Sequence, residues 1–206
     1  MQIITVSREF GSGGRELARR LADALKLSYY DNEIINEIAK QENLDADYVS
    51  RTLDSGLRWN MPIHYARSFV SSSSSAEAAH LLAEQHNIIR RLAAKGSCVI
   101  VGRGADAVLS KYTPFRIFAY ADINARAARC RANVRPDEEK LTDNELIRKI
   151  KQIDKNRALS YRLVSDTPWG DKHGYDFCIN TTGINIKEVT PLLADYAQQW
   201  FKNKIQ

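Results

Sequence analysis

The stretch that decides the fold is IITVSREFGSGGRELARRLADAL, residues 3–25. Its β-branched opening predicts a buried strand over 3–6, and the small residues at 11–14 predict a tight turn. Apolar residues then recur at helical spacing, at Leu17, Ala18, Leu21, Ala22 and Leu25. A strand, a glycine-rich turn and a helix N-terminus form a cradle of backbone N–H groups that favours an anion. The candidate phosphate-binding residues are Gly11, Ser12, Gly13, Gly14, Arg15 and Glu16.

The loop departs from the usual phosphate-loop pattern G-x-x-x-x-G-K-[ST] at two positions, and both departures change where its positive charge lies. Aligned without gaps, the lysine position falls on Gly14 and the first glycine of the pattern falls on Arg8. A guanidinium binds phosphate through two parallel hydrogen bonds, so either Arg15 or Arg8 is able to replace the lysine. A plain strand-to-helix turn, with glycines serving only packing, remains the alternative interpretation.

Composition indicates an ordinary globular domain of 206 residues, with 44% hydrophobic and 27% charged residues. The chain enters a strand at once and contains no apolar run of about 20 residues, so we expect a cytoplasmic protein without a membrane segment. The spacing of the cysteines and histidines indicates neither a disulfide framework nor a protein metal site. We expect Cys98 and Cys178 to be buried, and His80 and His86 to lie on the surface.

The net charge of +5 fits a polyanionic small ligand better than nucleic acid, because no nucleic-acid-binding module is recognisable. Further strands are predicted at 27–30, 98–101, 115–120 and 176–180, with helices at 33–41, 45–53, 76–95, 124–132, 143–163 and 186–201. Alternating strands and helices predict an α/β fold, a three-layer αβα sandwich around a five-stranded parallel sheet. Because the carboxyl ends of parallel strands meet at one edge, the loop, Asp31 and Arg103 should gather there.

Four segments, SREFGSGGRELARRLADAL, YYD, CVIVGRGAD and IDKNRALSY, together resemble the cytidylate kinase-like family in order and spacing. That family belongs to the nucleoside monophosphate kinases of the P-loop fold. The resemblance implies transfer of a phosphoryl group from ATP, with Mg²⁺, to a small nucleotide substrate such as CMP or dCMP. It also implies one kinase-like domain over 1–206, with an acceptor-binding insertion at about 32–75 and a mobile lid at about 126–142.

The resemblance assigns acceptor binding to Asp31, Arg103, Asp154 and Arg157. Arg103 matches the arginine of a Gly-Arg-Asp motif, although Gly104 stands in place of its aspartate. Asp154 and Arg157 match an Asp-x-x-Arg pair, and Asp31 matches the aspartate that ends the second strand. Two arginines of the family pattern are absent, because Ile150 and Glu37 occupy their positions.

Phosphoryl transfer needs positioned substrates and cations around the transferring oxygens more than it needs covalent chemistry. The candidate catalytic cations are Arg15 in the loop and Arg129 and Arg131 in the lid, although a solvated basic helix would give the same pattern at the last two positions. Two other functions remain open from the sequence. One is a nucleotide-binding protein of the kinase fold with little turnover, and the other is a P-loop kinase with a non-nucleotide acceptor. The sequence does not predict the oligomeric state.

Overall fold

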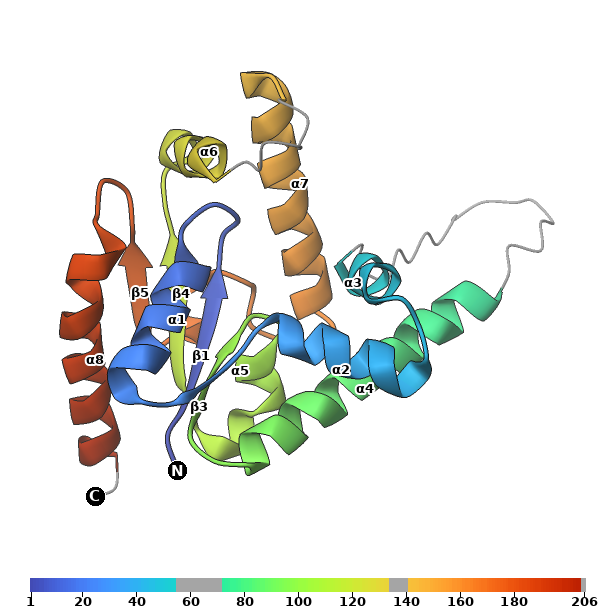
Figure 1. Ribbon diagram of the computed structural model, residues 1–206, viewed down its shortest axis with the longest axis horizontal. Coiled ribbons are helices and arrows are strands. Elements are labelled where there is room, and N and C mark those ends of the chain that lie inside the picture. The colour runs from blue at the N-terminus through green and yellow to red at the C-terminus, as the bar shows by residue number, and fades with distance from the viewer. Residues whose placement is uncertain (55–71, 134–140, 205–206) are drawn as a thin grey trace.

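The computed structural model describes residues 1–54, 72–133 and 141–204 (Figure 1). Its five strands pair in parallel in the order β2-β3-β1-β4-β5. They are β1 (Ile3–Arg8), β2 (Ser28–Tyr30), β3 (Cys98–Val101), β4 (Phe115–Tyr120) and β5 (Phe177–Asn180). The five-stranded parallel sheet predicted from the sequence is therefore confirmed.

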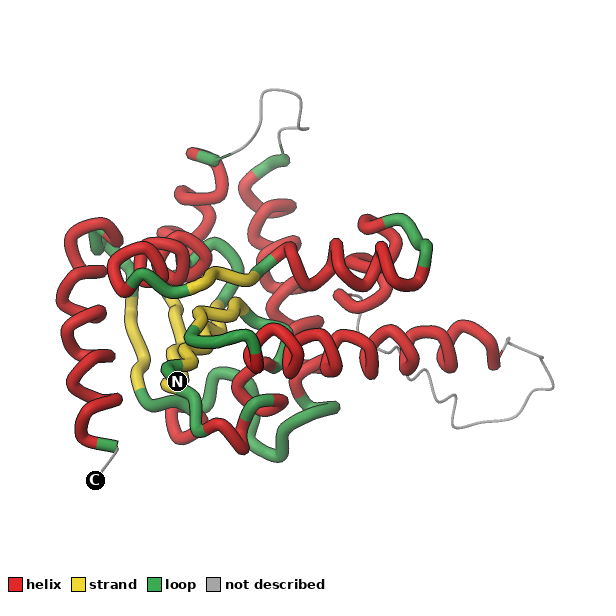
Figure 2. The backbone as a smooth tube through the Cα atoms, turned by 60° about the horizontal axis from the view of Figure 1, so that its bottom comes forward, coloured by secondary structure: helices red, strands yellow, loops and turns green. Residues whose placement is uncertain are grey.

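Helices cover both faces of the sheet, as Figure 2 shows. They are α1 (Gly14–Leu25), α2 (Asn32–Glu42), α3 (Ala46–Asp54), α4 (Ser72–Ala94), α5 (Ala105–Val108), α6 (Ile123–Ala132), α7 (Asp143–Tyr161) and α8 (Ile186–Asn203). Alternate residues of β1 face opposite layers: Ile3 packs with α2, α3, α4 and α5, whereas Ile4 and Val6 pack with α1 and α8. The three-layer sandwich follows from this alternation.

Strand β1 runs two residues beyond the predicted strand and ends at Arg8, so this side chain starts at the carboxyl edge of the sheet. Helices α6 and α7 stand beyond the same edge (Figure 1). The prediction that Cys98 is buried is confirmed, but the same prediction for Cys178 is wrong. Cys178 lies on edge strand β5, where Ile179 faces the core and the neighbouring Cys178 and Asn180 face outward.

The predicted acceptor-binding insertion, about 32–75, contains α2, α3 and the start of α4, and its residues 55–71 lie outside the described residues. The predicted lid, about 126–142, begins within α6, and its residues 134–140 lie outside them. Helix α7 then starts at a capping box formed by Thr142 and Glu145.

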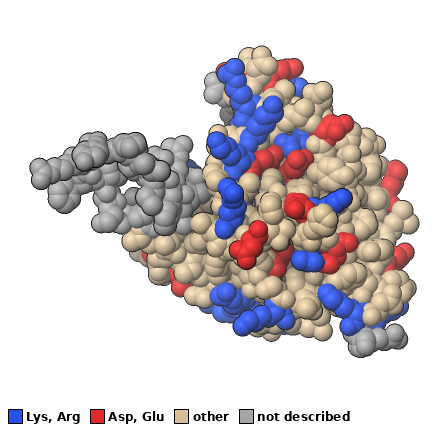
Figure 3. Space-filling view, turned by 180° about the vertical axis from the view of Figure 1, so that it is seen from behind, with Lys and Arg blue, Asp and Glu red and all other residues tan. Residues whose placement is uncertain are grey.

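The face drawn in Figure 3 carries charges of both signs, with a column of basic side chains and acidic side chains directly beside it. None of the helices within 1–54, 72–133 and 141–204 combines the length and apolar character that a membrane span requires.

Candidate active site

The glycine-rich loop joins β1 to α1 and is held in place by its own hydrogen bonds. Gly11 and Gly13 both have φ of 78°, a left-handed conformation that glycine adopts without strain. Between them Ser12 is fully buried, and its Oγ donates to the carbonyl oxygen of Glu9 at 2.9 Å. From the end of β5, Thr181 Oγ1 donates to the Ser12 carbonyl oxygen at 2.6 Å. The loop is thus fixed before any ligand arrives.

Helix α6 packs directly on this loop. Arg129 donates from Nη1 to the carbonyl oxygen of Gly11 at 2.8 Å and from Nη2 to that of Thr181 at 3.2 Å. The guanidinium of Arg129, which we expected to act as a catalytic cation from the lid, therefore lies at the loop. Arg131 lies elsewhere: its guanidinium forms an exposed ion pair with Asp143 at the start of α7.

A buried ion-pair network ties α6 to the loop and to α7. Arg126 has a side chain only 5% exposed, and its Nη1 lies 2.7 Å from Glu9 Oε2 while its Nη2 lies 2.6 Å from Asp154 Oδ2. The backbone N–H of Phe10 donates to the other oxygen of Asp154 at 2.7 Å. Burial raises the pKa of Asp154, and these partners act against that shift. Asp154 is thus bound to the loop and to α6 and is absent from the cavity lining.

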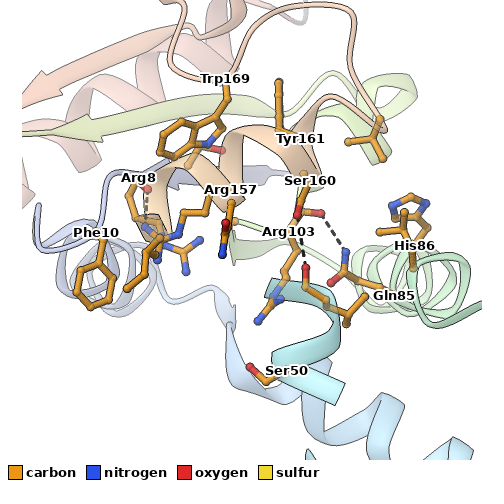
Figure 4. Close-up of a pocket in the computed structure, with 18 of the residues that line it drawn as sticks. Arg8, Phe10, Ser50, Gln85, His86, Arg103, Arg157, Ser160, Tyr161 and Trp169 are labelled. Carbon is orange, nitrogen blue, oxygen red and sulfur yellow. Dashed lines mark hydrogen bonds between the residues drawn. The ribbon is translucent and has the colours of Figure 1, made fainter. Parts of the chain in front are cut away.

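A cavity of about 290 Å³ lies beside the loop, at the carboxyl ends of β1 and β3 (Figure 4). Four arginines from four segments line it, namely Arg8, Arg15, Arg103 and Arg157. Arg103 follows β3 in a tight turn and has a positive φ of 58°. From α7, Arg157 donates to the carbonyl oxygen of Arg8 at 2.9 Å. The structure therefore brings Arg103 and Arg157, both expected to bind the acceptor, to the same cavity as Arg15, the expected cation of the loop.

Asp31 is the acidic partner of two of these arginines. Its Oδ2 lies 2.6 Å from Arg15 Nε and its Oδ1 lies 3.8 Å from Arg8 Nη2. Burial and the charge of Arg157 lower the pKa of Arg8 to about 9, and Asp31 opposes that shift. Arg8 still carries its charge at neutral pH, in a cluster of cations that an anionic ligand would stabilise.

The other side of the cavity is polar but uncharged. Gln85 and His86 of α4 lie opposite Arg8 and Arg157 in Figure 4, and Ser50, Asn156 and Ser160 also line the cavity. Gln85 is buried, and among the described residues its Oε1 has no hydrogen-bond partner. Burial lowers the pKa of His86, which favours the neutral ring. The prediction that His86 lies on the surface is wrong, because this face of α4 is turned toward the cavity.

The loop offers little that suits a metal ion. Glu16 turns away from it, since its carboxylate accepts from Arg20 Nε at 2.7 Å on the outer face of α1. Across the part of the chain that the structure describes, no group of three or more His, Cys, Asp or Glu side chains is arranged to hold a metal.

Comparisons with known proteins agree on the type of fold. A solved structure of an uncharacterized protein from Eubacterium ventriosum superposes with a TM-score of 0.67 at 24% identity, covering 96% of this chain and 99% of that one. Shikimate kinase from Bacteroides thetaiotaomicron superposes with a TM-score of 0.58 at 15% identity, covering 96% and 98% of the two chains. At these identities the likeness shows the fold alone. No curated protein was found to match the sequence.

The family comparison covers most of the chain. The family model described as "Cytidylate kinase-like family" matches residues 3–183, which include the glycine-rich loop and the four arginines of the cavity. Together with the P-loop kinase fold, this match supports a kinase for a nucleotide or another small molecule. The chain belongs to the cytidylate kinase-like family.

Proposed function

We propose that this protein transfers the terminal phosphoryl group of MgATP to the phosphate of a nucleoside monophosphate, with CMP or dCMP as the acceptor. The observation that carries the proposal is the convergence of four arginine side chains on one cavity beside the glycine-rich loop. Guanidinium groups bind phosphate oxygens in pairs, and the loop with the start of α1 suits the phosphates of the donor. The choice of a cytidine nucleotide comes from the family.

In the proposed reaction, an oxygen of the acceptor phosphate attacks the γ-phosphorus of ATP. The bond between the γ-phosphorus and the bridging oxygen breaks, ADP leaves with that electron pair, and the acceptor becomes a diphosphate. The protein contributes position and positive charge, since the transferring oxygens carry most of the charge in the transition state.

The arginines have distinct proposed roles. Arg103 and Arg157 bind the acceptor phosphate, because they reach the cavity from two separate segments. Asp31 holds Arg15 at the edge of the cavity, with the Arg15 side chain 61% exposed and open to an entering substrate. Arg129 neutralises charge at the donor side, next to the loop carbonyl that it already contacts. Any role of Arg131 depends on a lid movement that separates it from Asp143, and this remains a prediction.

The uncharged side of the cavity suits a nucleoside. A base presents flat faces and a hydrogen-bonding edge, and this side offers the amide of Gln85, while the rings of Phe10 and Trp169 line the cavity on the side of Arg8 and Arg157 (Figure 4). Both substrates are small molecules, and no nucleic-acid or membrane partner is part of the proposal. A cytoplasmic location is proposed with it.

A non-nucleotide acceptor is the second candidate. The same guanidiniums bind a carboxylate as well as a phosphate, and the fold is shared with a shikimate kinase. A nucleotide binder with little turnover is the third candidate, favoured by the glycine that stands in place of the loop lysine. All three candidates use the same cavity, so acceptor chemistry and turnover distinguish them.

A panel of acceptors tests the proposal. Purified protein is mixed with MgATP and each nucleoside monophosphate or small hydroxylated carboxylate, and ADP release is followed alongside identification of the product. We expect ADP formation and a nucleoside diphosphate with CMP or dCMP. Phosphorylation of a hydroxylated carboxylate, with no transfer to any nucleoside monophosphate, would support the second candidate. Binding of MgATP with no transfer to any acceptor would support the third.

A further inference from the structure

Two departures from the phosphate-loop pattern meet in space. In sequence they are six residues apart: Arg8 stands where the pattern has its first glycine, and Gly14 stands where it has lysine. A Cβ atom placed on Gly14 would lie 2.5 Å from Arg8 Cβ and 3.1 Å from Arg8 Cγ. The side chain of Arg8 thus occupies the space in which a lysine at position 14 would begin. The positive charge that the pattern has at position 14 is thus found at position 8, which lies beside it in space.

A second glycine leaves room for the far end of the same side chain. Gly102 follows β3 with φ of 68°, and a Cβ atom placed there would collide with Nη1 of Arg8. The Arg8 guanidinium therefore lies against the backbone at the carboxyl end of β3, with Nη2 3.8 Å from Asp31 Oδ1. Its side chain is only 14% exposed, yet it lines the cavity. Arg8 thus reaches from the loop to the acceptor cavity.

The charges around Arg8 favour an anion at this place. Burial lowers the pKa of Arg8 most, Arg157 from α7, Arg103 after β3 and Arg15 from α1 lower it further, and Asp31 is the neighbour that raises it. A buried cation surrounded mainly by cations is costly unless a negative group offsets it. Phosphate oxygens arriving between the loop and the cavity would supply that charge.

We infer that Arg8 is the phosphate-binding cation of this loop, acting in place of the absent lysine at the junction of the donor and acceptor sites. This inference rests on the proposed function for its catalytic meaning, while phosphate binding itself is measurable without turnover. Two other arginines near the loop suit the role less well. Arg15 is held by Asp31 with most of its side chain in solvent, and Arg129 already donates to the carbonyl oxygens of Gly11 and Thr181.

The test moves the positive charge from position 8 to position 14, where the phosphate-loop pattern has its lysine. Four variants are compared with the parent: Arg8→Met, Gly14→Lys, the double variant Arg8→Gly with Gly14→Lys, and Arg15→Met. Arg91→Met serves as the matched control, because Arg91 forms an exposed ion pair with Glu37 on the surface. Calorimetry gives the affinity for inorganic pyrophosphate, and thermal unfolding gives the Tm of each variant.

We expect Arg8→Met to weaken pyrophosphate binding by at least about tenfold, the loss of a charge-assisted hydrogen bond, while Arg91→Met binds like the parent. Gly14→Lys alone should lower the Tm, because the new side chain meets Arg8. The double variant should recover most of the affinity and part of the Tm, since the lysine then begins where Arg8 had been while Ala119 Cβ still lies 3.1 Å from the new Cβ. If Arg8→Met fails to fold, the double variant still tests the exchange.

The inference is overturned if a folded Arg8→Met binds pyrophosphate as tightly as the parent, or if the double variant folds without recovering affinity. A tenfold loss in Arg15→Met alone would assign the cation to Arg15, and a parent that does not bind pyrophosphate would also reject the inference. Phosphoryl transfer is scored separately. Loss of binding in Arg8→Met with no transfer by the parent would keep the inference and reject the proposed function.

Discussion

Arg126 and Asp154 form a buried ion pair in which Nη2 of the arginine lies 2.6 Å from Oδ2 of the aspartate. The same guanidinium binds Glu9, and the same carboxylate accepts from the backbone of Phe10. The loop, α6 and α7 therefore share one electrostatic junction. Arg126 and Asp154 are 28 residues apart in the sequence, and Phe10 and Asp154 are 144 residues apart. The junction therefore joins distant parts of the chain.

The first prediction concerns the stability of this junction. Arg126→Met removes the cation between Glu9 and Asp154, with only Arg157 Nη1 left at 3.7 Å from Asp154 Oδ1. Removing one partner of a buried ion pair costs about 3–5 kcal/mol. Urea unfolding should show a loss of about 3 kcal/mol or more, against less than about 1 kcal/mol for the exposed control Arg91→Met. Equal losses in the two variants would show that the junction does not stabilise the fold.

The second prediction concerns the loop glycines. A valine at position 13 must adopt φ of 78° and would meet Ile186 and Arg129, whereas a valine at position 183 must adopt φ of 68° with nothing within 4 Å. Both variants should lose basal stability through backbone strain. MgATP at 100 times its Kd should stabilise the parent and Gly183→Val by about 2.7 kcal/mol. Gly13→Val should not be stabilised by MgATP. If MgATP stabilises Gly13→Val as much as the parent, the nucleotide does not bind at this loop.

The third prediction concerns the pH dependence of stability. Asp106 is buried, accepts from Tyr161 Oη at 2.6 Å through Oδ2, and has no described partner for Oδ1. Burial raises the pKa of this carboxyl above 3.8, so the folded state holds its proton to higher pH than the unfolded chain does. The stabilisation is complete below about pH 3.8 and is lost as pH rises through the folded pKa.

Asp106→Asn removes this titration and preserves the side-chain shape. The free energy of unfolding of the parent, relative to the variant, should therefore fall as pH rises from about 4 through the raised folded pKa of Asp106. Urea unfolding across this range measures the difference. A constant difference at all pH values would mean that Asp106 is ionised normally in the folded protein.

Much of the fold could be predicted from the sequence, because its signals are local. The β-branched runs 3–6 and 98–101 predicted two central strands, and parallel pairing placed Arg103 and the loop at one edge of the sheet. The positions of Arg103 and Arg157 at one cavity follow from that topology and from the family pattern.

The remaining features depend on tertiary contacts that no local pattern encodes. The path of Arg8 between Gly14 and Gly102 requires the register of β1 against β3. The extra arginine and the missing lysine in one loop made Arg8 and Arg15 candidates from the sequence, but the choice between them needed the structure. Gln85 and His86 were missed because the rotation of α4 about its axis decides which of its polar residues face the cavity. Cys178 was misplaced because a short strand does not reveal that it lies at the edge of a sheet.

The fourth prediction tests the central claim that the four-arginine cavity binds the acceptor phosphate. The measurement is the steady-state rate of ADP formation as a function of CMP concentration, for the parent, Arg103→Ala and the surface control Arg91→Ala. Arg103→Ala should raise the KM for CMP and lower kcat/KM by at least about tenfold, while the KM for ATP stays within about twofold. Arg91→Ala should match the parent. Equal changes in the two KM values, or an Arg103→Ala enzyme as efficient as the parent, would contradict the assignment of this cavity to the acceptor.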